Sequence, residues 1–167
     1  MTDLLATSVI RDVFRGVKAR GGALTEEDGQ ALASLSVEDL QLLQAASELV
    51  ERRAVKRVTA VPSQRSFCRV ESLNRYHHHQ PHQSVMTTDS QPGTGGDPSG
   101  ASFYNCFDHF CSCATFLLAA SKSPTSMCKH MIAALLADAT GQSVAISVAD
   151  ADLPKMLCPS IGHSAPL

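Results

Sequence analysis

The chain has 167 residues, of which 44% are hydrophobic and only 5% aromatic, and its formal net charge is −2. This length predicts one domain with appendages, and the composition predicts a core built mostly from aliphatic side chains. No apolar run approaches the roughly 20 residues that cross a bilayer, and the N-terminus shows no signal peptide. We therefore expect a location in the cell interior, where the six cysteines do not form a disulfide framework.

The distribution of charge is more informative than its total. Residues 101–167 contain three cationic and four anionic side chains. A nucleic-acid-binding protein normally carries a dense basic surface that displaces counterions from phosphates. The near-neutral C-terminal part therefore argues against tight, autonomous DNA binding.

The N-terminal region reads as short amphipathic helices. Residues 3–20 predict the first helix, which Gly21 and Gly22 end. Two capping-box patterns follow, at residues 25–28 and 36–39, and the second predicts a helix that runs to about Arg53. We expect these helices to pack in a core. The alternative, which is compatible with such packing, leaves part of one face to a partner protein. The predicted core positions of the first helix are Leu5, Ile10, Val13, Phe14 and Val17, and those of the last are Val37, Leu40, Leu43, Ala46 and Val50.

The pattern changes after about residue 56. Residues 57–61 and 66–70 predict two strands of a β-hairpin, because turn-forming residues separate two short apolar stretches. Residues 73–100 are rich in His, Gln, Ser, Gly and Pro, and they cannot bury enough apolar surface to offset their ordering entropy. We interpret them as a disordered insertion. Weak metal binding by their histidines is the alternative, which concerns His77, His78, His79 and His82.

Regular structure is predicted again from Ser102. Residues 103–107 and 110–113 read as strands, and residues 128–139 read as a helix that Gly141 ends. The predicted core face of this helix contains Ile132, Leu135, Leu136 and Ala139. Residues 150–156 predict one further short helical turn before a loose tail.

A Cys-x-Cys pair and a Cys-x-His pair, separated by residues 114–127, are the strongest chemical signal. Zn²⁺ in structural sites prefers four nitrogen or sulfur ligands in a tetrahedron. Cys111 and Cys113 can share an ion at the end of a strand, where residues two apart point the same way. Cys128 and His130 would diverge by about 200° within a helix, so Cys128 must lie at or before its first turn. The closed set of four ligands predicts a structural ion rather than a catalytic one.

Other chemistries fit the sequence less well. Cys106 and His109 are close enough to serve as spare ligands, whereas Cys68 and Cys158 belong to no pair. A cysteine nucleophile would need a histidine base with an orienting third group, and none is evident. The zinc deaminase and phosphate-loop motifs are absent from the sequence. Redox chemistry at Cys111 and Cys113 remains the enzymatic alternative.

The order Cys-x-Cys, spacer, Cys-x-His resembles the SWIM-type zinc finger. The wider stretch, FCSCATF followed by MCKHMIAALL, is similar to the zinc-finger subunits of Shu recombination complexes. The resemblance is strong over about residues 102–140 and only architectural over 1–72. It implies that Cys111, Cys113, Cys128 and His130 bind one structural Zn²⁺, and that no catalytic residues are present.

The combined prediction is an α+β protein with short N-terminal helices, a β-hairpin and a small ββα-type SWIM zinc finger. Its predicted regions are helical residues 1–55, hairpin 56–72, insertion 73–100, finger 101–141 and C-terminal segment 142–167.

The resemblance implies a nuclear, non-enzymatic subunit that promotes recombinase assembly in homologous-recombination repair of DNA double-strand breaks. It also implies a recombinase-paralogue ATPase-like partner and indirect or weak contact with single-stranded DNA. The alternative function is a SWIM finger that binds DNA or protein in chromatin or in a transposase-derived protein.

Overall fold

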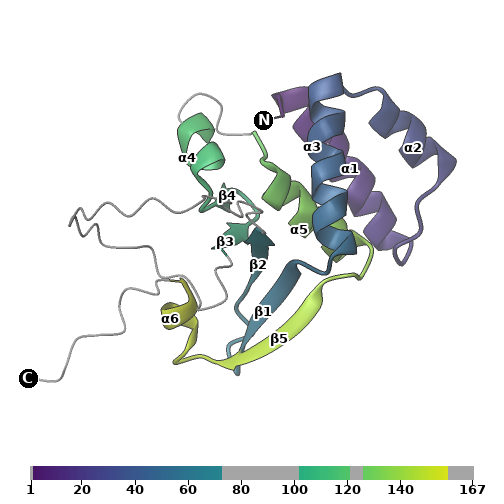
Figure 1. The fold of residues 1–167 in the computed structure, drawn as a ribbon. Helices are drawn as coiled ribbons and strands as arrows, with labels where there is room; N and C mark the ends of the chain where they lie inside the picture. The colour runs from purple at the N-terminus through teal and green to yellow at the C-terminus, as the bar shows by residue number, and fades with distance from the viewer. Residues whose placement is uncertain (1, 73–101, 121–125, 158–167) are drawn as a thin grey trace, which may run out of the picture.

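The computed structural model describes residues 2–72, 102–120 and 126–157, and it shows an α+β fold (Figure 1). Three helices come first, then a β-hairpin, and then a second region of strands and helices, as the sequence predicts. The predicted insertion at 73–100, its histidines and Cys158 lie outside the described residues. The elements are α1 (Leu4–Ala19), α2 (Glu26–Ala33), α3 (Val37–Glu51), β1 (Val55–Val61), β2 (Ser66–Ser72), β3 (Ser102–Phe107), β4 (Phe110–Cys111), α4 (Ala114–Ala120), α5 (Lys129–Ala139), β5 (Val144–Ala149) and α6 (Leu153–Leu157).

One five-stranded sheet, in the order β4-β3-β2-β1-β5, joins the N-terminal and C-terminal halves of the chain. The hairpin β1–β2 continues into β3 and β4 with antiparallel pairing throughout. Strand β5 then lies parallel to β1 and pairs Lys56 with Val144 through Val61 with Ala149. The predicted hairpin and the strands of the predicted finger therefore share one hydrogen-bonded sheet.

The two faces of this sheet are covered by different helices. Val55 and Val70 are register partners, and both belong to the main core, in which α5 packs against α1, α3 and the sheet. Side chains alternate across a strand, so the pair three positions further along, Val58 and Phe67, belongs to the opposite face. There they form a smaller core with Leu153 of α6, and Figure 1 shows α6 apart from the helical bundle.

Helix α1 confirms the predicted apolar stripe with one correction. Ile10, Val13, Phe14 and Val17 are buried, whereas Leu5 is 73% exposed. The prediction for Leu5 was wrong because five residues at about 100° each place it about 140° from Ile10 around the helix.

Helix α3 begins where its capping signal predicts. The Ser36 side chain accepts the Asp39 N–H, and Ala46 and Val50 are buried. Val37 is 66% exposed, so the start of the predicted core stripe was wrong. No helix over the described residues has the length and apolar character needed to cross a membrane.

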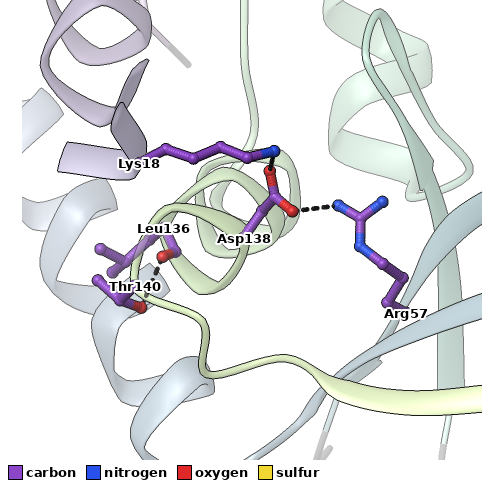
Figure 2. Close-up of polar contacts among 5 residues, drawn as sticks. All are labelled: Lys18, Arg57, Leu136, Asp138 and Thr140. Atoms are coloured by element: carbon purple, nitrogen blue, oxygen red, sulfur yellow. Dashed lines mark hydrogen bonds and ion pairs between the residues drawn. The ribbon is translucent and has the colours of Figure 1, made fainter. Parts of the chain in front are cut away.

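Asp138, near the end of α5, connects three elements of the fold (Figure 2). Its two carboxylate oxygens accept hydrogen bonds from Lys18 of α1 at 2.6 Å and from Arg57 of β1 at 2.5 Å. Two residues after Asp138, the Thr140 hydroxyl donates to the Leu136 carbonyl at 2.8 Å, and the same carbonyl accepts the Thr140 N–H at 2.9 Å. These contacts fix the C-terminal end of α5 relative to the sheet and to α1.

Candidate metal centre

The four predicted ligands come together between the edge of the sheet and the start of α5. Cys111 ends β4 and Cys113 immediately precedes α4, while Cys128 and His130 belong to the beginning of α5. Their ligand atoms all lie within 4.8 Å of one another, and all four residues are buried. The chain therefore builds a Cys/His cluster that can hold a metal ion.

The start of α5 allows the side chains of the Cys-x-His pair to reach the same point, although residues two apart point in different directions within a helix. Cys128 is the N-cap residue with extended backbone angles, and His130 lies in the first turn. The carbonyl of Cys128 accepts the Ile132 N–H at 3.1 Å, whereas its side chain makes no capping bond. The thiol is thus free to face the cluster, as the sequence predicted for a residue at the helix boundary.

The separations within the cluster match a tetrahedral ion. Nδ1 of His130 lies 3.9 Å from the Sγ atoms of both Cys111 and Cys128. Ligands of tetrahedral Zn²⁺, with bonds near 2.3 Å to sulfur and 2.0 Å to nitrogen, lie about 3.5 to 3.8 Å apart. Nδ1 is accordingly the atom of His130 that is placed to bind an ion. Among the described residues, nothing hydrogen-bonds to its buried Nε2.

Electrostatics favours a cation at the centre of this cluster. Hydrogen bonds from Cys111 and then Cys128 hold the pKa of the Cys113 thiol far below its usual range. Hydrogen bonds to Cys106 and then Cys113 raise the pKa of Cys111, and those to Cys111 and then Cys113 raise the pKa of Cys128. The three sulfurs thus influence one another's ionisation through hydrogen bonds. A bound cation would let all three ionise.

Two aromatic residues support the ligands. Tyr104 of β3 lies against the His130 ring with centroids 4.4 Å apart. The backbone N–H of Phe116 donates to the Cys113 sulfur at 3.3 Å, and the Phe116 side chain is buried in the main core. Neither residue was predicted to support the site, although Tyr104 shares a strand face with Cys106 and could have been found on that basis.

The N-terminus also contacts the residue that precedes Cys128 at the start of α5. No signal in the sequence predicts this contact. The Thr2 hydroxyl accepts the Met127 N–H at 2.8 Å, and the Thr2 N–H donates to the Met127 carbonyl at 3.4 Å. Met127 directly precedes the ligand Cys128. The first residues of the chain therefore help to hold one ligand in place.

The two predicted spare ligands have different positions. His109 is exposed in the turn between β3 and β4. Cys106 is buried, and its sulfur lies 3.5 Å from the Cys111 sulfur without joining the four-residue group. All five cysteines among the described residues are free of disulfides.

Comparison with protein-family models, with curated proteins and with solved structures gives no match to this chain. The resemblance to SWIM-type zinc fingers therefore stays a prediction.

Proposed function

We propose that Cys111, Cys113, Cys128 and His130 bind one structural Zn²⁺ ion. Three thiolates and one imidazole form a soft donor set that suits zinc in tetrahedral geometry. All four side chains are at most 5% exposed, so the site offers no open position for a substrate. The ion would connect the end of β4 to the start of α5, and its role would be to stabilise the fold.

Zinc content and folding test this metal assignment. Purified chain is expected to contain one equivalent of zinc by elemental analysis, and chelation is expected to reduce its helical circular dichroism. The matched variants are Cys113→Ser, which removes a ligand, and Cys68→Ser, which changes a buried cysteine outside the cluster. Zinc-free native protein, or an unchanged melting curve after chelation, would contradict the assignment.

We further propose that the chain is a non-enzymatic, nuclear subunit of a Shu-type complex that promotes recombinase assembly in homologous recombination. The observation that carries this proposal is the Cys-x-Cys and Cys-x-His tetrad assembled between a strand end and a helix start. The near-neutral charge of residues 101–167 supports a subunit that acts through a recombinase-paralogue ATPase-like partner and touches single-stranded DNA weakly or indirectly.

Exposed leucines identify candidate partner surfaces. Leu117 of α4 is 53% exposed, and Leu4 and Leu5 at the start of α1 are 66% and 73% exposed. The same short helix α4 uses the buried Phe116 to contact the core and to hold Cys113. The metal centre would thus fix the orientation of an apolar surface that a partner protein can cover.

Affinity purification of the full chain from its own cells tests the recombination function. We expect recovery of a recombinase-family ATPase, which Cys113→Ser would abolish, and sensitivity of the variant cells to DNA double-strand breaks. Leu117→Glu tests the partner surface independently of the metal site. It should weaken partner recovery while the zinc content stays at one equivalent.

Two results would contradict the recombination function. The first is the absence of recombinase-family proteins together with normal break repair in the ligand variant. The second is strong, salt-dependent binding of duplex DNA by the isolated chain, which would favour a general DNA-binding finger.

A further inference from the structure

Three cysteines form a row across neighbouring strands of the sheet. Cys68 of β2 is the register partner of Cys106 in β3, and Cys106 is the register partner of Cys111 in β4. Directly paired residues lie on the same face of a sheet, so all three thiols belong to the face that α5 covers. Only the last of them, Cys111, is a member of the metal-binding tetrad.

Cys106 and Cys111 are placed for direct reaction with each other. Their sulfur atoms are 3.5 Å apart, within hydrogen-bonding distance. Next to this pair, the Ser112 N–H donates to the Asn105 carbonyl at 3.0 Å. Cys106 and Cys111 therefore occupy the adjacent, non-hydrogen-bonded position of the antiparallel ladder. The Cα atoms in such pairs are about 4.5 Å apart, within the range of about 4.4 to 6.8 Å that a disulfide spans.

A cleft provides small molecules with a route to this pair. Its volume is about 450 Å³, and it lies between α5 and the sheet, with Arg57, Asp138, His109 and Met131 in its walls. Cys68 and Cys106 line it, whereas none of the cysteines in the described tetrad does. A small oxidant that enters the cleft therefore meets Cys106 before it meets a metal ligand.

We propose that Cys106 is a site of oxidative modification by hydroperoxides, and that its oxidation converts Cys111 from a metal ligand into a disulfide partner. This proposal rests on the metal site proposed above. The Cys106 sulfur attacks one peroxide oxygen, the O–O bond breaks, and sulfenic acid forms together with one water, or with one alcohol when the oxidant is an organic hydroperoxide. The Cys111 sulfur then attacks the Cys106 sulfur, the S–O bond breaks, and hydroxide leaves. Two electrons pass from the two sulfurs to the peroxide.

The consequence is a reversible loss of one of the four ligands. A sulfur in a disulfide is no longer a thiolate and does not bind the ion, so three ligands remain. A thiol reductant restores both cysteines by exchange, and metal can then bind again. The zinc-bound and oxidised states would therefore differ in structure where β4 contacts α5. This contact supports the rest of the finger.

The test uses the full chain loaded with Zn²⁺ and treated with hydrogen peroxide, with a chromophoric chelator reporting the released metal. Wild-type protein should release zinc, and Cys106→Ser should release it at least about fivefold more slowly. Cys68→Ser is the matched control and should behave as wild type. Cys106→Ala provides a second variant in case the serine hydroxyl disturbs the buried site.

Peptide mapping identifies the bond that forms. Cleavage on the amino side of aspartate at Asp97, Asp108 and Asp138 places Cys106 on one peptide and Cys111 on the next. After alkylation of the remaining thiols, a cross-link between these two peptides that fragmentation assigns to Cys111 supports the proposal. Cross-links confined to Cys113 and Cys128, or one joining Cys106 to Cys68, would overturn it, as would equal zinc release from Cys106→Ser.

The same map made on metal-free chain separates this proposal from the zinc assignment. If the chain never binds zinc, the metal site fails, while a Cys106–Cys111 cross-link would still show that the thiol pair reacts. If the chain binds zinc and the cross-link is absent after peroxide, the oxidative site alone fails.

Discussion

The Tyr104 ring lies against the His130 imidazole with its plane tilted by 31°, so a strand residue supports a helix ligand across the metal cluster. No hydrogen bond among the described residues orients the buried Nε2 of His130. The ring contact therefore takes the place of the hydrogen bond that normally fixes a metal-binding histidine.

Replacing Tyr104 with Ala should lower the zinc affinity by about tenfold, because the imidazole loses the surface that orients it. Tyr104→Phe keeps the ring and should retain the wild-type affinity. Competition with a chromophoric chelator measures both constants. Equal affinities for the Ala and Phe variants would show that the aromatic ring does not orient the ligand.

Replacing His130 with Ala should remove zinc completely and lower the free energy of unfolding by about 3 kcal/mol or more, because metal-binding energy contributes to folding. Cys68→Ser is the control, since Cys68 is also buried but lies outside the tetrad. Elemental analysis and chemical denaturation give the two readouts. Zinc retained in His130→Ala would contradict the ligand assignment.

Asp138→Asn should lower the free energy of unfolding by about 1 to 2 kcal/mol, because the carboxylate pairs with both Lys18 and Arg57. Its side chain is 27% exposed, so solvent screens these pairs only in part. Asp12→Asn removes the Arg15 pair, whose side chains are 76% and 62% exposed, and should change stability by less than about 0.5 kcal/mol. Equal effects of the two variants in urea denaturation would contradict this.

Asp28 makes stability depend on pH. Hydrogen bonds from the Thr25 backbone N–H, then from Arg20 and the Thr25 hydroxyl, hold the pKa of this carboxyl below its ordinary value of 3.8. A carboxyl whose pKa is lower in the folded state stabilises the protein above its ordinary pKa. That contribution disappears as the pH falls through the folded value.

Asp28→Asn should therefore lower the melting temperature at pH 7, and the difference from wild type should shrink as the pH falls below 3.8. Thermal unfolding of both proteins across this range is the measurement. Loss of metal in acid affects both proteins alike and cancels in the difference. A difference that stays constant with pH would assign the effect of the substitution to packing instead.

Local signals predicted most of the helices and the hairpin. The Thr25–Asp28 capping box occurs as predicted, with each side chain bonded to the other's backbone. The helix start at Cys128 followed from the geometric demand of a Cys-x-His pair. Both features depend on residues within one turn of each other, which a sequence displays directly.

Strand β5 was missed because its partner is distant in the sequence. Val144, Ile146 and Val148 alternate with more exposed residues, which is a period-two signal, but only parallel pairing with β1 makes this segment a strand. Helix α4 gave no amphipathic pattern, since Leu117 is exposed. The contact of Cys106 with Cys111 likewise depended on a strand register that spacing alone does not specify.

The connection between β2 and β3 starts and ends at neighbouring points of the sheet, because Ser72 and Ser102 are register partners. The entropic cost of closing this connection grows only with the logarithm of its length, so doubling the length costs about 0.6 kcal/mol. We therefore expect this junction to accept a fluorescent or affinity module without a shift in the register of the sheet.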